Sequence, residues 1–157
     1  MDSAKLNDWM QVIGIFAVVA SLVFVGLQMK QDHKIAMAAA YHARAQTTVD
    51  LTMAAAANPL WLSAQHKWRA EGPDSLTPEE RLSNIYVRVA NLQLWDSIHY
   101  QYVSGLIDEE QWQRTRSAMR ISMQDRSIRD VYEGGRDYYR PSYRAEIDKI
   151  LEELDAE

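Results

Sequence analysis

The sequence predicts an all-α protein: an N-terminal transmembrane helix continuous with a long juxtamembrane helix, followed by a small helical bundle. Three observations predict this fold. A run of 21 residues near the N-terminus has no charged side chain, helix-start signals recur along the rest of the chain, and no stretch shows the apolar–polar alternation of a strand. We expect five or six helices in three regions: an N-terminal flank (1–8), a transmembrane helix (9–29) and a soluble helical domain (30–157).

The uncharged run extends from Trp9 to Met29. As an α-helix it spans about 31 Å at about 1.5 Å per residue, which matches a hydrocarbon core of about 30 Å. A cleaved signal peptide has a positive N-terminal region and a small-residue cleavage site. Here Asp2 and Asp8 surround Lys5, and no A-x-A follows at a suitable distance. The run therefore predicts an uncleaved anchor rather than a signal peptide or a buried core helix.

Positive residues are more numerous on the C-terminal side of this run. Lys30, Lys34 and Arg44 follow it, whereas only Lys5 precedes it. Because positively charged flanks favour the cytoplasmic side of a membrane, we expect a single-pass protein whose C-terminal domain lies in the cytoplasm.

Small residues form a stripe on the expected anchor. Gly14, Ala17 and Ser21 are three and four residues apart and therefore share one helix face. Such a face lets membrane helices approach closely, which predicts self-association through this stripe. The alternative is the ordinary composition of membrane helices, in which small residues are common.

The residues after the anchor continue the helix. Residues 30–57 contain no proline or glycine and ten alanines. Alanine is the best helix former, so the first helix is expected from about residue 7 to residue 57. A seam of mostly small residues, spaced three and four apart, runs along it: Ile35, Ala38, His42, Ala45, Val49, Thr52 and Ala56. This spacing suits close helix packing, and we expect the remaining helices to pack on the seam.

The next two helices have clear N-terminal signals. Asn58 is a good N-cap and a proline follows at the first helical position, so a short helix is expected over 59–70. In the segment TPEE at 77–80, the threonine and the last glutamate form a capping box. This box predicts an amphipathic helix over about 78–104, ended by a left-handed glycine at position 105.

Further helices are expected in the C-terminal part. Asp108 and Asp125 each occupy an N-cap position, and Pro141 opens the last helix. The pair Gly134-Gly135 is expected to interrupt or loosen the helix that starts at Asp125. Core packing is the expected role of the aromatic residues of the domain, and a binding groove for an apolar or flat ligand is the alternative.

Three segments carry a resemblance to a bacterial family. They are the anchor and its exit, VVASLVFVGLQMKQD at 18–32, the stretches LTPEERLSN at 76–84 and NLQLWDSIHYQYVSGLIDEEQW at 91–112, and the tail RDYYRPSYRAEIDKIL at 136–151. Together they resemble a widespread, uncharacterised family of short, single-pass, all-helical membrane-anchored proteins. The resemblance covers most of the chain and implies the bacterial inner membrane, but it implies no activity. Related chains often have Ser-Pro before the last helix, whereas this one has Arg140-Pro141, which puts the N-cap there in doubt.

Composition and motifs argue against several functional classes. The net charge of −5 disfavours nucleic-acid binding, which needs a basic surface. The absence of cysteine excludes disulfides and thiolate metal ligands. The chain has no G-x-S-x-G nucleophile elbow and no glycine-rich phosphate loop. We therefore expect no nucleic-acid partner, no cofactor and no catalytic residues.

One pair of side chains resembles part of a metal site. Asp96 and His99 are three residues apart on the expected third helix. Di-iron bundles use two Glu-x-x-His motifs and two further carboxylates, whereas this chain has one such pair, with aspartate in place of glutamate. A polar pair at the edge of the core is the preferred interpretation, and no metal ligand is assigned.

Arginines are concentrated in one part of the domain. Residues 114–144 contain eight arginines and four acidic residues, and residues 145–157 contain one lysine and six acidic residues. The two stretches either pair with each other or present the arginines to anionic lipid headgroups or phosphate. The candidate lipid contacts are Arg114, Arg116, Arg120, Arg126 and Arg129.

These observations favour a non-enzymatic, membrane-anchored scaffold or interaction protein that self-assembles, with membrane lipids and copies of itself as partners. Three alternatives remain open. One is an oligomeric pore or sensor, in which Gln11, Ser21 and Gln28 provide the polar lining. Another is an accessory subunit of a larger membrane complex. The third is an enzyme of another type that uses Asp96 and His99.

Overall fold

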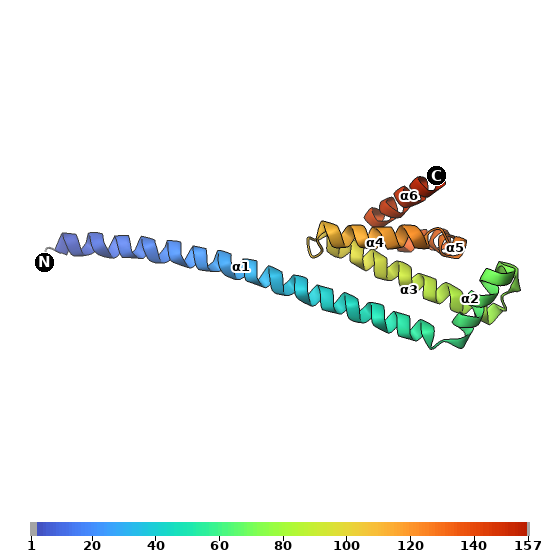
Figure 1. The fold of residues 1–157 in the computed structure, drawn as a ribbon. Coiled ribbons are helices and arrows are strands. Elements are labelled where there is room, and N and C mark those ends of the chain that lie inside the picture. The colour runs from blue at the N-terminus through green and yellow to red at the C-terminus, as the bar shows by residue number, and fades with distance from the viewer. Residues whose placement is uncertain (1–2, 157) are drawn as a thin grey trace. The chain divides into compact units, whose positions relative to one another are not determined.

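The computed structural model describes residues 3–156, with side chains from residue 7 onward. Its helices are α1 (Ser3–Ala56), α2 (Pro59–Glu71), α3 (Pro78–Val103), α4 (Glu109–Ser122), α5 (Arg126–Gly134) and α6 (Pro141–Asp155), and two short 3-10 turns cover Pro73–Ser75 and Arg136–Tyr138 (Figure 1). The described residues include no strand. The predicted all-α fold, with a long N-terminal helix and a helical bundle, is confirmed.

Local signals placed the helix starts correctly. The side chain of Asn58 accepts hydrogen bonds from the backbone N–H groups of Leu60 and Trp61, at 3.0 and 3.1 Å. Asp108 and Asp125 cap α4 and α5 in the same way. At the end of α3, Gly105 has a φ of 74°, a left-handed conformation that favours glycine.

The last helix begins without a side-chain cap, as the Arg140-Pro141 sequence suggested. The Arg140 side chain crosses to α3 instead. Its Nε donates to Asp96 at 3.1 Å, and its guanidinium lies 4.5 Å from the centre of the Tyr100 ring. This arginine therefore links α6 to α3. It does not provide the N-cap hydrogen bond that a serine at this position would make.

The capping box of α3 is formed as predicted. Its glutamate also binds side chains of α2, which the sequence does not indicate. Glu80 accepts from the Thr77 backbone N–H at 2.9 Å, from Lys67 Nζ at 2.9 Å and from Ser63 Oγ at 2.6 Å. Its side chain is buried although it is ionised. The hydrogen bonds from Lys67, Ser63 and Thr77 lower the pKa of the Glu80 carboxyl from 4.5 to about 2. Glu80 thus joins α2 to the start of α3.

The lowered pKa of Glu80 makes the stability of this junction depend on pH. Because the folded-state pKa lies below that of the unfolded chain, the stabilisation is fully present above about pH 4.5 and is lost as the pH falls towards 2. We expect Glu80→Gln to unfold at a lower temperature than wild type at pH 7, and this difference to shrink between pH 5 and pH 2. Thermal unfolding of the full chain at several pH values tests this expectation. Glu79→Gln, an exposed neighbour, serves as control, and a difference independent of pH would contradict the assignment.

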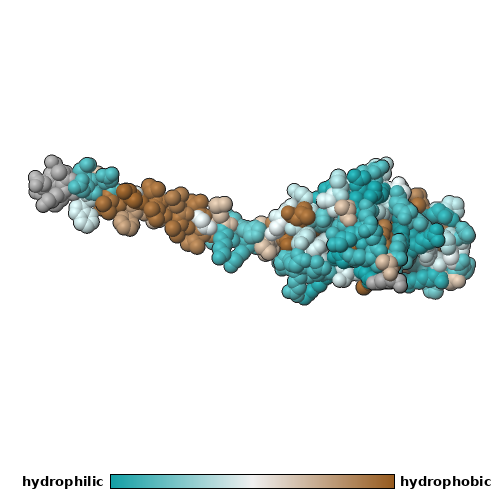
Figure 2. Space-filling view, turned by 90° about the horizontal axis from the view of Figure 1, so that it is seen from above, coloured by the Kyte–Doolittle hydropathy of each residue, from teal (hydrophilic) through white to brown (hydrophobic). Residues whose placement is uncertain are grey.

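The chain divides into two compact units, residues 1–40 and 41–157. In the first unit the side chains of residues 7–36 are all exposed. Figure 2 shows apolar residues along the visible face of this segment. Among the described residues, one helix is long and apolar enough to cross a membrane, and its most apolar window has a mean hydropathy of 2.4. The predicted anchor therefore has the length and composition of a membrane span.

The second unit has its core among α3, α4, α5 and α6. Fully or almost fully buried side chains make up this core: Leu92, Ile98, Ile107, Trp112, Met119, Met123, Ile128, Tyr132, Tyr139, Tyr143, Ile147 and Ile150. Tyr132 also donates a hydrogen bond to Asp148 at 3.0 Å, and burial raises its pKa to about 12. Core packing, the predicted role of the aromatic residues, is confirmed for Trp112, Tyr132, Tyr139 and Tyr143.

The expectation that the other helices pack on the seam of α1 is wrong. The five seam residues that belong to the second unit, from His42 to Ala56, are exposed. The side of α1 that is turned to the bundle is marked by Arg44, the only buried side chain of residues 7–56, with Leu51 half-buried nearby. Arg44 donates to Gln101 at 2.5 Å and to Gln111 at 3.3 Å. Because the seam side chains are mostly small and offer little area, a polar contact of Arg44 decides which side of the helix faces inward.

Candidate functional site

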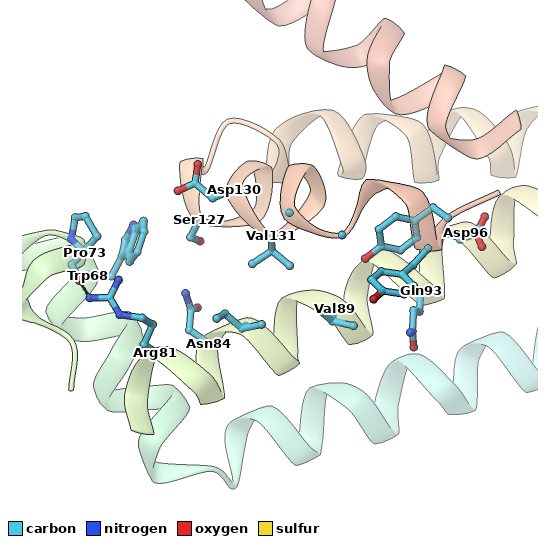
Figure 3. Close-up of a pocket in the computed structure, with 15 residues that line it drawn as sticks. Trp68, Pro73, Arg81, Asn84, Val89, Gln93, Asp96, Ser127, Asp130 and Val131 are labelled. Atoms are coloured by element: carbon cyan, nitrogen blue, oxygen red, sulfur yellow. Dashed lines mark hydrogen bonds between the residues drawn. The ribbon is translucent and has the colours of Figure 1, made fainter. Parts of the chain in front are cut away.

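A groove lies between α2, α3 and α5, and the turn at Arg136–Tyr138 closes one end of it (Figure 3). Its volume is about 680 Å³. Pockets for small molecules usually measure about 300–1,000 Å³. The groove is therefore large enough for a small molecule, and all of its lining residues belong to the second unit.

Apolar side chains from all three helices form most of the groove surface. Ile85 and Val89 lie four residues apart on α3, and Val131 lies four residues after Ser127 on α5. Residues with this spacing share one face of a helix, so α3 and α5 each present a short row of side chains to the groove. Three rings complete the lining: Trp68 from α2, and Tyr138 and Tyr139 from the segment before α6.

Two buried polar side chains interrupt the apolar surface. Ser127 is 3% exposed, and its hydroxyl finds no hydrogen-bond partner in the described part of the chain. Asn84 is 4% exposed, and its side-chain oxygen accepts from Gln65 at 3.0 Å. Its amide nitrogen is therefore the atom left to donate. Figure 3 shows Ser127 on α5 and Asn84 on α3 pointing into the space between the two helices.

The position of Ser127 is fixed by the start of α5. Asp125 accepts from the Ser127 backbone N–H at 2.9 Å and binds Arg88 of α3 at 2.5 Å. The Arg88 guanidinium also lies 5.1 Å from the centre of the Trp61 ring of α2. Burial lowers the pKa of Arg88. One arginine therefore connects the three helices that enclose the groove.

The charged residues along the groove have partners within the chain. Arg81 donates to the Pro73 carbonyl oxygen at 3.3 Å, Asp96 is bound by Arg140 at 3.0 Å, and Asp130 lies 3.8 Å from Arg126. The groove thus combines an apolar surface with neutral polar groups, and each of these three charged side chains has a hydrogen-bond or ion-pair partner within the chain.

The structure separates the two residues of the hypothetical metal site. Asp96 is bound by Arg140, at the edge of the groove. His99 is buried, and its ring centre lies 5.3 Å from that of Trp112 and 5.9 Å from that of Tyr143. Burial lowers the pKa of His99, which favours the neutral imidazole. Within the described residues, no three side chains of the metal-binding types come together.

The arginine-rich stretch is paired with acidic residues of the C-terminal part. Arg116 binds Glu146 at 2.6 Å and Glu153 at 2.7 Å, and Arg129 binds Asp155 at 2.9 Å. The expected pairing between the two stretches is confirmed for these arginines. Arg114 and Arg126 contact Glu110 and Asp130 of their own helices, and Arg120 also has an interaction within the chain. Contact of these five arginines with lipid or phosphate stays a prediction.

The small-residue stripe is exposed on α1. Nothing lies within 4 Å of a side chain added at Gly14. The Ser21 hydroxyl donates to the Ala17 carbonyl oxygen at 2.8 Å, so it is satisfied within its own helix. The stripe is therefore free of polar groups that need a partner, and self-association through it stays a prediction.

Comparison of the chain with protein families, with curated proteins and with solved structures gives no match.

The sequence suggested a groove for an apolar or flat ligand only as an alternative role of the aromatic residues, and it did not indicate where such a groove lies. Its two buried polar residues are far apart in the chain, and each has a local explanation, since Asn84 lies within an amphipathic helix and Ser127 follows an N-cap. No spacing motif joins them. The only local signal is the capping aspartate, which fixes where α5 begins and hence where Ser127 lies.

Proposed function

We propose that this protein is a membrane-anchored helical interaction protein that self-assembles through α1 and has no catalytic role. The observation that carries the proposal is the exposed seam of α1. In the second unit, the seam residues from His42 to Ala56 have coiled-coil spacing and are not covered by the bundle, and the same helix bears the anchor.

The stripe and the seam follow one heptad repeat. Twenty-one residues, or three heptads, separate Gly14 from Ile35, and the same interval separates Ala17 from Ala38. In a coiled coil, such positions face the partner helix along its whole length. A parallel assembly of two or more α1 helices would bury both sets together, and anchors inserted in one direction into one membrane favour the parallel arrangement.

The charge distribution supports the rest of the proposal. The positive residues after the anchor favour a cytoplasmic position of the second unit. The resemblance of the chain to a bacterial family implies that the membrane is a bacterial inner membrane. Lipids are the expected surroundings of the anchor. Conductance of the purified chain in a lipid bilayer tests the alternative of a pore.

Cysteine cross-linking in native membranes tests self-assembly directly, because the chain has no cysteine of its own. Ala45 belongs to the seam, and Ala54, nine residues later, lies two and a half turns away and therefore on the opposite side of α1. Both are exposed. We expect Ala45→Cys to form a covalent dimer under mild oxidation and Ala54→Cys to remain monomeric, at about a tenfold difference in yield.

Equal cross-linking of Ala45→Cys and Ala54→Cys, or no cross-linking of either, would contradict assembly through the seam. Native mass spectrometry of the gently extracted protein provides the second readout, and Ala17→Leu is expected to reduce the oligomer if the stripe is also a contact. A monomer bound to a different protein would identify the chain as an accessory subunit instead.

A further inference from the structure

We propose that the groove between α2, α3 and α5 is a binding site for a neutral, flat, largely apolar molecule that carries a carbonyl group. The site is distinct from the α1 surfaces used for self-assembly, so this proposal does not depend on the proposed function. Four properties of the groove support it: its unpartnered hydroxyl, its charged side chains that already have partners, its rings and its volume.

The Ser127 hydroxyl is the first argument. A buried polar group without a partner is unfavourable, and each such group in a folded protein calls for an explanation. Ser127 is 3% exposed, its hydroxyl has no partner among the described residues, and it points into the groove (Figure 3). A ligand that accepts a hydrogen bond would satisfy this hydroxyl.

Asn84 specifies the same kind of ligand atom. Its side-chain oxygen is occupied by Gln65, which leaves its amide N–H groups as donors. A hydroxyl and an amide N–H on facing walls can both donate to one oxygen with two lone pairs. A carbonyl oxygen has this property, whereas an apolar group would leave both donors unpaired.

The charges along the groove indicate that the ligand is neutral. Arg81, Asp96 and Asp130 each have a partner within the chain. An anionic ligand would meet two carboxylates against one guanidinium, that of Arg81, which already donates to a backbone carbonyl oxygen, and a cationic ligand would compete with Arg140 for Asp96. Neither charge is favoured over a neutral molecule.

The shape and size of the groove indicate a flat molecule. The groove is lined by the ring of Trp68 from α2 and by the rings of Tyr138 and Tyr139 from the segment before α6. Aromatic rings stack on flat partners and bury a large area with few rotatable bonds. Ile85, Val89 and Val131 add an apolar surface, in a volume of about 680 Å³.

Titration of the full chain in lipid nanodiscs with 2-naphthamide tests the proposal. This probe is neutral and flat, and it carries one carbonyl group. Its anionic analogue 2-naphthoate has the same rings, and nanodiscs without protein measure partition into lipid. Saturation-transfer NMR detects binding, and we expect 2-naphthamide to bind at least tenfold more tightly than 2-naphthoate.

Two variants assign the binding to the groove. Ser127→Ala removes the hydroxyl and is expected to weaken 2-naphthamide about tenfold, which corresponds to the loss of one buried hydrogen bond. Its matched control is Ser117→Ala, because Ser117 is exposed on α4 and donates to the Gln113 carbonyl oxygen. Ile85→Trp fills the groove from a partly exposed position and is expected to abolish binding. Thermal unfolding verifies that each variant is folded.

The proposal is overturned if 2-naphthamide shows no binding beyond that of empty nanodiscs, or if 2-naphthoate binds as well. It is also overturned if Ser127→Ala and Ser117→Ala bind the probe equally, since the buried hydroxyl would then make no contact with it. Binding that survives Ile85→Trp would place the probe outside the groove and would also overturn the proposal.

Discussion

Leu92→Ala is expected to lower the free energy of unfolding of the second unit by about 2–5 kcal/mol. Leu92 lies within α3 and is fully buried in the core shared by α3, α4, α5 and α6. Replacement by alanine removes apolar area and leaves a cavity that neighbouring side chains fill only in part. Because small domains have a total stability of about 5–15 kcal/mol, this single change removes a large fraction of it.

The matched control for this change lies on the same helix. Leu82 is 50% exposed, so Leu82→Ala makes the same chemical change where little area is buried. We expect its effect to stay within about 0.5 kcal/mol. Urea unfolding of the full chain, followed by tryptophan fluorescence, measures both variants. Equal effects at the two positions would show that the core is not where the structure places it.

The double change Phe16→Asp and Val19→Asp is expected to abolish stable membrane integration. Val19 is the middle residue of the uncharged run 9–29, and an aspartate near the middle of a membrane span is unfavourable by about 3 kcal/mol. Two such residues change the insertion free energy by about 6 kcal/mol, which is more than a thousandfold in the equilibrium. Extraction of cell membranes at alkaline pH measures the result: the wild-type chain stays with the membrane, and the variant is released.

The control for the anchor change keeps its chemistry and spacing. Ala36→Asp and Ala39→Asp introduce two aspartates three residues apart on exposed positions of α1, beyond the uncharged run. We expect this variant to remain in the membrane fraction. If both double variants stay there, or if the wild-type chain is itself released, residues 9–29 are not a membrane anchor.

Local sequence signals predicted most of the helix boundaries. Each predicted N-cap, at Asn58, Thr77, Asp108 and Asp125, accepts the expected backbone hydrogen bond. These interactions join residues two or three positions apart, so the sequence contains everything that determines them. The uncharged run is equally local, since its length and composition alone match a membrane span.

The seam of α1 shows where periodicity was insufficient. The spacing of Ala38, Ala45 and their neighbours correctly marks a face suited to close packing, but it does not say what covers that face. The bundle is attached to another side of α1, through Arg44 and two glutamines that are about 60 residues further along the chain. From the sequence, an arginine on an alanine-rich helix is expected to be exposed to solvent, and only the fold shows that Arg44 is buried.

The sequence by itself determined the class of the fold, the positions of its helices and the segment able to cross a membrane, because capping, helix propensity and apolar length depend on neighbouring residues. The tertiary structure decided which side of α1 meets the bundle, how the arginines pair with the acidic tail, and that Asn84 and Ser127 face one groove. These features join residues about 30 to 70 positions apart. Their contacts depend on the packing angles and rotation of whole helices, which no local pattern encodes.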